Sequence, residues 1–193
     1  IIGYILPFSL FVSLFEQSGS SLLLFLERAV DREVMGMTVP ASTLNSLNPF
    51  LVLVLGFIAL PLLTRYLGRG KLLDGVTKMG CGFLFATASF WMGAFFFQTL
   101  GELWIAPVSL TKISQSAPPR LQGVLMSFWT MAIAYGHYFA GLIAQFSIKP
   151  EASSEGFLEH YQTFFFSLGL LALGGGVTLL ICRIVKARGL AAR

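Results

Sequence analysis

Long, nearly charge-free stretches separate the charged residues of this chain into five clusters. Only 11% of its 193 residues are charged and 55% are hydrophobic, whereas a typical soluble domain carries about 25% charged residues. The stretches run for roughly 23 to 33 residues, and a helix of about 20 apolar residues crosses a hydrocarbon core of about 30 Å. The sequence therefore predicts an all-α, polytopic membrane protein embedded in the lipid bilayer.

The signs of the charge clusters predict the topology. Lys and Arg favour the cytoplasmic side of a membrane. The clusters at 65–78, 112–120 and 183–193 are basic, whereas those at 27–33 and 149–159 are acidic. One crossing fits between each acidic cluster and a basic neighbour, so both ends of the chain are expected in the cytoplasm. The membrane is expected to be the plasma membrane or the inner membrane of the cell.

The stretch 79–111 joins two basic clusters and must cross an even number of times, so we expect two spans within it. Two helices of about 20 residues and a turn need more than its 33 residues. Counting back from Lys112 leaves about 13 residues for the first of these two helices. Either this hairpin is unusually short or residues are missing from the chain near Gly93, and we favour missing residues.

A bundle of six transmembrane helices is the predicted architecture, and it occupies the whole chain, 1–193. Pro40 is expected just outside the second helix, with Ser42 or Thr43 as its N-cap. The predicted spans are 1–26, 43–64, 79–92, 93–111, 121–147 and 161–182.

Two carboxylates, Glu16 and Glu102, fall inside predicted spans. A charge at the bilayer centre costs roughly 3 kcal/mol, so such residues usually face a cavity or a partner and mark a transport pathway. Helical spacing places polar neighbours on the same face as each acid. These groups are Ser13, Gln17 and Ser20 with Glu16, and Gln98 and Ser109 with Glu102.

Two prolines lie near polar groups of the spans. Pro107 cannot donate to the carbonyl of Leu103, so a kink is expected beside Glu102. Pro49 follows Asn48 and frees the carbonyl of Asn45 in the same way.

Structural roles are open for several of these polar residues. The acids, the amides and the serines could instead form hydrogen bonds between helices, which average about 0.6 kcal/mol in a membrane protein. Trp129 fits either a lipid-facing position or a site, and His137 is expected as a buried hydrogen-bonding group rather than a proton relay.

Enzyme chemistry finds no support in the sequence. It contains no metal-ligand spacing of His and Cys, no Gly-rich phosphate loop and no nucleophile motif. We therefore expect no catalytic residue, no metal and no cofactor. The net charge of +4 follows from membrane orientation, so no nucleic-acid partner is expected.

Four segments in order resemble the C-terminal half of the proton-coupled oligopeptide transporters, which belong to the major facilitator superfamily. The segments are FVSLFEQSGSSLLLFLERAVDR, VPASTLNSLNPF, TLGELWIAPVSLTKISQSAPPRLQGVLMSFW and AYGHYFAG. The resemblance implies that the six helices are the seventh to twelfth of twelve. The N-terminal half and its acidic and arginine-rich signature are absent, so this chain alone is not expected to transport.

The resemblance also implies roles for individual residues. Glu102 would hold the amino terminus of a peptide, with Asn48 and Trp129 lining the same site. Glu16 would pair with basic groups of the N-terminal half when the outer gate closes. Gln17, Ser20 and Gln98 are expected to line the pathway.

The function that the resemblance implies is symport of di- and tripeptides with protons by alternating access, with protons as the coupling ion. A relative that carries another solute, such as nitrate or a drug-like molecule, is the first alternative. A structural membrane subunit without a solute pathway is the second.

Overall fold

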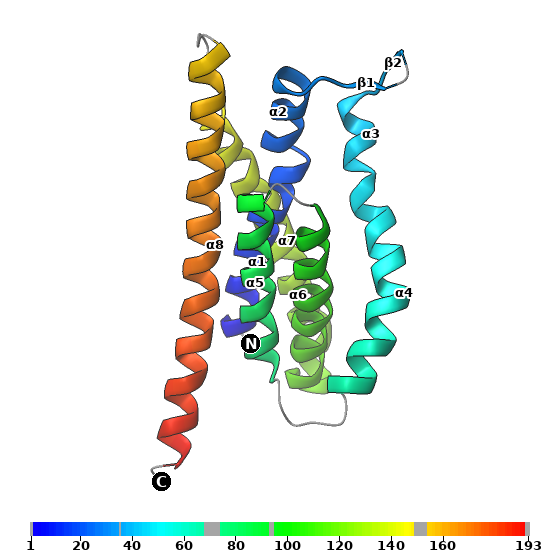
Figure 1. The fold of residues 1–193 in the computed structure, drawn as a ribbon. Helices are drawn as coiled ribbons and strands as arrows, with labels where there is room; N and C mark the ends of the chain where they lie inside the picture. Colours follow the sequence, from blue (N-terminus) through cyan, green and yellow to red (C-terminus); the bar gives the residue numbers. More distant parts are fainter. Residues whose placement is uncertain (1, 35, 68–73, 93–94, 149–153, 192–193) are drawn as a thin grey trace.

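The computed structural model describes residues 2–34, 36–67, 74–92, 95–148 and 154–191. It is built almost entirely of helices, as the sequence predicts (Figure 1). The elements are α1 (Ile2–Phe15), η1 (Glu16–Ser18), α2 (Ser21–Ala29), β1 (Glu33–Val34), β2 (Met37–Thr38), α3 (Ala41–Asn45), α4 (Leu47–Leu67), α5 (Gly75–Met92), α6 (Phe95–Ser116), η2 (Pro119–Leu121), α7 (Gln122–Gln145) and α8 (Ser154–Ala191).

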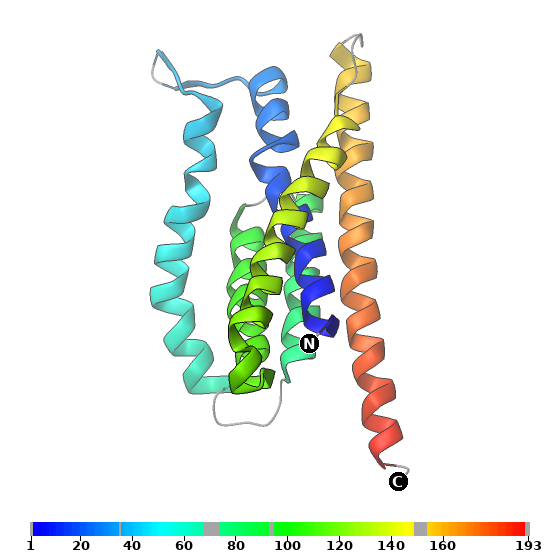
Figure 2. The ribbon, with the colours of Figure 1, turned by 180° about the vertical axis from the view of Figure 1, so that it is seen from behind.

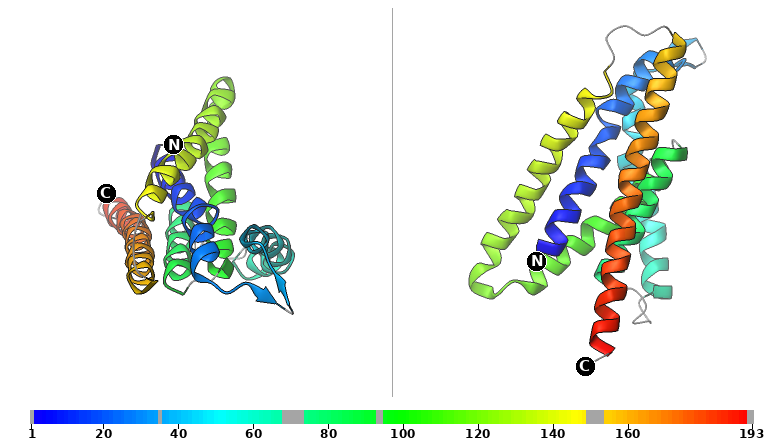
Figure 3. Two further views of the ribbon diagram at one scale, coloured as in Figure 1. Left: turned by 90° about the horizontal axis from the view of Figure 1, so that it is seen from above. Right: turned by 90° about the vertical axis from the view of Figure 1, so that its left-hand side faces the viewer.

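The helices run up and down through the bundle. α5 packs between α6 and α8, and α7 packs along α1. α4 and α8 lie on opposite flanks of the molecule, as the view from above shows (Figure 3). Seen from behind, α7 crosses in front of α1 and α5 (Figure 2). The core of the bundle consists of apolar side chains from five helices, namely Phe8, Phe11, Leu14, Met79, Phe83, Ile105, Ala132 and Ala172.

Two very short strands interrupt the helical fold at one end of the bundle. β1 and β2 pair antiparallel, with Glu33 opposite Thr38 and Val34 opposite Met37. Gly36 has a φ of 79°, a left-handed conformation that residues other than glycine adopt at a cost. This small hairpin links α2 to α3 at the opposite end from the C-terminus (Figure 1).

Three segments are long and apolar enough to cross a membrane, judged within the described residues by length and composition. They are Gly3–Ala29, Ala41–Ile58 and Gly156–Arg188. The acidic cluster containing β1 and the basic end of α8 lie at opposite ends of the bundle (Figure 1). Which end faces the cytoplasm, and whether all six helical segments span the membrane, stay predictions.

The α5–α6 hairpin is longer than the sequence indicates. α5 has 18 residues and α6 has 22, because both helices extend into the segments 65–78 and 112–120 that we expected to be loops. Their upper ends still stop well below those of α2, α3 and α8 (Figure 1). The expected break near Gly93 falls on residues 93–94, which lie outside the described residues.

Asp74 explains why α5 begins early. Its carboxylate accepts a hydrogen bond from the backbone N–H of Thr77 at 3.0 Å and one from the Thr77 hydroxyl. This is the arrangement of an N-cap, which satisfies a free N–H at the start of a helix. Arg183 of α8 lies 3.3 Å from the same carboxylate, so the cap also ties α5 to α8.

The second helical segment starts earlier than predicted and is interrupted once. α3 begins at Ala41, and the N–H of Thr43 donates to the carbonyl of Pro40 at 3.0 Å. Pro40 therefore holds the cap position, and the N-cap assigned to Ser42 or Thr43 was wrong. The break at Ser46 between α3 and α4 follows from Pro49, which has no N–H for the Asn45 carbonyl.

Two glycines allow the closest backbone approaches near the polar residues. A Cβ on Gly101 of α6 would lie 2.9 Å from the carbonyl oxygen of Gly82 in α5. A Cβ on Gly136 of α7 would lie 3.1 Å from the carbonyl oxygen of Ser9 in α1, and 2.6 Å from the Cβ of Val12. Backbone cannot move away as a flexible side chain can, so these contacts fix where α6 and α7 cross their neighbours.

Candidate functional site

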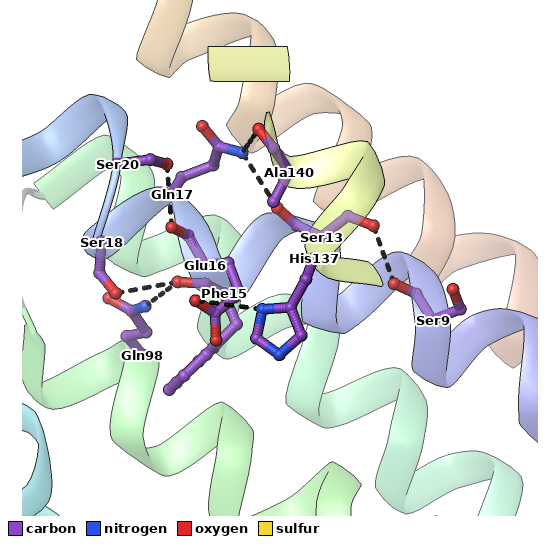
Figure 4. Close-up of polar contacts among 10 residues, drawn as sticks. All are labelled: Ser9, Ser13, Phe15, Glu16, Gln17, Ser18, Ser20, Gln98, His137 and Ala140. Carbon is purple, nitrogen blue, oxygen red and sulfur yellow. Dashed lines mark hydrogen bonds and ion pairs between the residues drawn. The ribbon is translucent and has the colours of Figure 1, made fainter. Parts of the chain in front are cut away.

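The first helical segment breaks at Glu16. α1 ends at Phe15, a single 3₁₀ turn covers Glu16–Ser18, and α2 starts only at Ser21. The sequence indicated one continuous helical face carrying Ser13, Glu16, Gln17 and Ser20, and this was wrong because the helix does not continue through them. The side chains of the break instead point in different directions (Figure 4).

Polar side chains donate hydrogen bonds to two backbone carbonyl groups at the break. The Ser18 hydroxyl donates to the carbonyl of Phe15 at 2.9 Å, and the amide of Gln98 in α6 donates to the same carbonyl at 2.7 Å. The Ser20 hydroxyl donates to the carbonyl of Glu16 at 3.0 Å. Gln98 and Ser20 therefore stabilise the break, because their side chains supply hydrogen bonds that an unbroken helix would form within its own backbone.

Gln17 joins α1 to α7. Its side chain is fully buried. Its amide N–H groups donate to the carbonyls of Ser13 at 3.1 Å and Ala140 at 3.0 Å, and its amide oxygen accepts from the Ser21 hydroxyl at 2.6 Å. Gln17 and Gln98 also line a cavity of about 100 Å³ with apolar side chains that include Phe25 and Phe165. These contacts are those of a structural hydrogen-bonding group.

Glu16 faces His137 of α7. The Nδ1 atom of His137 lies 3.5 Å from Oε2 of Glu16 (Figure 4). The side chain of His137 is 53% exposed and that of Glu16 is 34% exposed. The prediction that His137 is buried was wrong, because the buried stripe of α7 runs through Ala132, Gly136 and Ala140, one position away from the histidine.

Glu102 lies half-buried between α6 and α4. The amide nitrogen of Asn48 lies 3.5 Å from its Oε2 atom, at the long limit for a hydrogen bond. The hydroxyl of Thr99 lies 2.7 Å from Oδ1 of Asn48 and 3.0 Å from the carbonyl of Phe95, and its single proton can serve only one of them at a time. The resemblance paired Glu102 with Asn48 in one site, and the structure brings them together.

Thr99 was missed by the sequence analysis. It is fully buried, and it lies three residues before Glu102, so the two are neighbours on the surface of α6. That spacing is the signal that could have identified it.

Glu102 has no basic partner within the part of the chain that the structure describes. The ion pairs found there are His137 with Glu16, and Arg183 with Asp74. Glu102 thus offers a partly desolvated negative charge with one weak neutral contact. Chemically, such a group is suited to bind a cation.

Trp129 connects three helices rather than lying freely at the surface. Its ring stacks on Phe8 of α1, with centroids 5.3 Å apart and planes inclined by 12°. Its indole N–H donates to the buried hydroxyl of Ser109 in α6 at 3.4 Å. Ser109 follows Glu102 by two helical turns, so Asn48 and Trp129 contact different levels of α6. Their role in binding stays a prediction.

Comparison with known proteins identifies relatives of one kind. Residues 1–96 match the model of the POT family. The chain is 28% identical over 194 residues to a dipeptide and tripeptide permease B of Salmonella typhimurium, covering 89% of this chain and 40% of that protein. It is 30% identical to a dipeptide and tripeptide permease A of Proteus mirabilis, covering 89% of this chain and 38% of the relative.

Solved structures share the fold. A crystal structure of peptide transporter POT in complex with sulfate superposes with a TM-score of 0.79 at 21% identity, covering 97% of this chain and 40% of that one. A POT family transporter in complex with 5-aminolevulinic acid gives a TM-score of 0.75 at 20% identity, covering 93% of this chain and 39% of that one. The chain thus spans about 40% of the length of these relatives.

Proposed function

Because this chain belongs to the POT family, we propose that it forms the C-terminal six-helix half of a transporter for small peptides. The complete protein would carry di- and tripeptides with protons across the cell membrane by alternating access, in which the two halves rock around a site between them. The relatives named as dipeptide and tripeptide permeases support the substrate class. The chain covers about 40% of their length, so transport requires the remainder of the protein.

The environment of Glu102 is the observation that carries this proposal. A peptide has a cationic amino terminus, which loses hydration as it enters a partly dry cavity. A carboxylate offsets that loss through a charge-assisted hydrogen bond, worth about 1.5 to 3 kcal/mol. Glu102 is half-buried and has no basic partner within the described residues, so it remains available to an incoming ammonium group. Asn48 orients it from α4.

The proposed proton coupling depends on Glu16. Glu16 lies at a break in the first helical segment, 34% exposed and close to His137. A carboxylate in this position can exchange a proton with water and can also pair with a cation of the other half. Protonation would end such a pairing, and this would link proton binding to the movement of the halves.

Uptake into liposomes tests the proposed function. The complete protein, purified and reconstituted, would be given a labelled dipeptide with and without an inward proton gradient. Accumulation that depends on the gradient is the expected result. Accumulation of nitrate without peptide would favour the first alternative, and the absence of any solute movement would favour a structural subunit.

A further inference from the structure

His137 and Glu16 form a pair whose position is fixed on both sides. The chain contains two histidines, and His137 is the one that lies against an acid, with 3.5 Å between Nδ1 and Oε2. The residue before it, Gly136, lets α7 approach α1. The hydrogen bond from Gln17 to the carbonyl of Ala140 joins the same two helices one turn further along. Both side chains are nevertheless partly exposed in the described structure, and they face each other between α1 and α7 (Figure 4).

We propose that His137 controls the availability of Glu16, an inference that rests on the proposed proton-coupled transport. With its ring protonated, His137 donates a hydrogen bond to the Glu16 carboxylate and retains it within this half. After the ring releases one proton, its positive charge is lost and a neutral N–H donor is all that it can offer, so the carboxylate can bind a cationic group elsewhere in the complete transporter. Proton binding at the imidazole thus competes with pairing between the halves.

The choice of residue types sets the pH at which this competition occurs. An imidazole ordinarily gains and loses its proton between about pH 5 and 8, whereas a solvated carboxyl group does so near pH 4. Histidine is therefore the residue type whose charge can change near neutral pH. A glutamine or asparagine in its place would supply a hydrogen bond but no titratable charge.

Other charged groups near the pair are few among the described residues. Glu102 of α6 interacts electrostatically with Glu16, and α6 also contributes the neutral amide of Gln98. The remaining basic and acidic groups of the helices packed on α1 lie near the ends of those helices. These groups are Lys112 in α6, Lys78 in α5 and Glu159, Arg183, Lys186 and Arg188 in α8.

Histidine titration by NMR tests the pair without requiring transport. The complete protein in detergent, labelled in its histidine rings, would be titrated, with the His137 signal identified by its loss in His137→Gln. Removal of the carboxylate in Glu16→Gln should change the chemical shifts of the His137 ring nitrogens, because the protonated ring loses the acceptor that lies 3.5 Å away. The His160 signal should stay in place, because that ring contacts the carbonyl of Phe146. A His137 signal that is the same in the parent and in Glu16→Gln would overturn the proposal.

The pH profile of uptake tests the role of the pair in coupling. Dipeptide uptake by the parent should be faster at about pH 5.5 than at about pH 8. In His137→Gln the ratio of the uptake rates at these two pH values should fall to about 1. Peptide binding at about pH 8 should stay within about twofold of the parent. His160→Gln serves as the matched control and should keep the parent profile.

A double variant and a second substitution of His137 complete the test. The double variant Glu16→Gln/His137→Gln should behave like Glu16→Gln alone, because the histidine acts through the carboxylate. His137→Asn checks the result with a different side chain should His137→Gln fail to fold. A changed His137 NMR signal in Glu16→Gln with an unchanged uptake profile in both histidine variants would overturn the coupling role. A parent that moves no peptide would instead refute the proposed function, while the NMR titration would still decide the pair.

Discussion

The side-chain amide of Asn48 lies 3.5 Å from the Glu102 carboxylate, although 54 positions separate them in the chain. The contact depends on the interruption of the second helical segment at Ser46 and on Thr99, whose hydroxyl lies 2.7 Å from the Asn48 carbonyl oxygen. A neutral amide orients the carboxylate but leaves its charge uncompensated. The arrangement agrees with the proposed cation site, which would be preorganised but incomplete within the described chain.

Replacement of Glu102 by glutamine should weaken peptide binding. The variant keeps the shape of the side chain and removes its charge. A lost charge-assisted hydrogen bond of about 1.5 to 3 kcal/mol corresponds to a roughly 10- to 100-fold lower affinity. The measurement is a binding titration on the complete protein. A dipeptide with a blocked amino terminus is the control, and it should bind the parent weakly and lose little more in Glu102→Gln. Equal losses for both peptides, or none for either, would remove Glu102 from the substrate site.

Thr99→Val should weaken peptide binding less than Glu102→Gln does. Valine preserves the volume of the buried threonine but removes the hydroxyl that contacts Asn48. The amide then loses one hydrogen-bond partner, and the orientation of Glu102 becomes less fixed. A loss of about 1 kcal/mol, or roughly fivefold in affinity, is expected for one neutral hydrogen bond. Thr99→Ser retains the hydroxyl and should bind like the parent. If the serine and valine variants are equally impaired, the hydroxyl is not the cause.

Gln17→Leu should destabilise the bundle without specifically lowering peptide affinity. The substitution removes three hydrogen bonds and leaves the Ser21 hydroxyl without its Gln17 acceptor. A buried group that loses its partner costs about 1 to 3 kcal/mol. Thermal unfolding in detergent measures the loss, with Leu22→Ala in the same cavity wall as a comparison for packing alone. A stable variant with a large loss of binding would mean that Gln17 contacts the substrate.

Asp74→Asn should lower stability at neutral pH but not at acidic pH. Partial burial acts to raise the pKa of Asp74, but hydrogen bonds from Thr77 and the charges of Arg183 and Lys112 outweigh it and lower the pKa from its ordinary value of 3.8. The stabilisation is then fully present above pH 3.8 and is lost as the pH falls through the lower folded pKa.

The charge of Asp74 is more than half exposed, so the expected difference at neutral pH is only about 0.2 to 1 kcal/mol. Thermal unfolding of parent and variant, compared from pH 7 downward, measures it. The gap between the two should close below pH 3.8. A gap that stays constant with pH would show that the asparagine disturbs packing rather than charge.

Cysteine labelling tests the predicted topology. After the two native cysteines are replaced, a membrane-impermeant reagent added to intact cells should label Glu33→Cys and Glu155→Cys. It should not label Arg69→Cys or Lys186→Cys, because the basic segments are expected in the cytoplasm. Permeabilised cells provide the control that all four positions are reactive. Labelling at position 69 from outside would reverse the orientation.

The helical segments could be located from the charge clusters, because a long apolar stretch in a membrane has few alternatives to forming a helix. Their limits were less certain, since the start of α5 depends on a capping interaction of Asp74 and the start of α3 on Pro40. The proximity of Asn48 and Glu102 came from the family resemblance. Periodicity along a single helix contains no information about contacts between α4 and α6.

The break at Glu16 could not be predicted from helical spacing. The segment from Ser13 to Ser21 is polar and contains Gly19, but an unbroken polar face explains the same residues. What stabilises the break is the amide of Gln98, which lies 83 positions from its acceptor Phe15. The exposure of His137 depends likewise on the rotation of α7 about its own axis relative to α1. The close approach of Gly136 to Val12 sets that rotation.

The two glycines at the closest backbone contacts have a mechanical consequence. Gly101 and Gly136 directly precede Glu102 and His137. When one packed helix tilts against another, the points nearest the contact move least and the distant ends move most. We therefore expect the residue that follows each glycine to keep its position if the ends of the helices move.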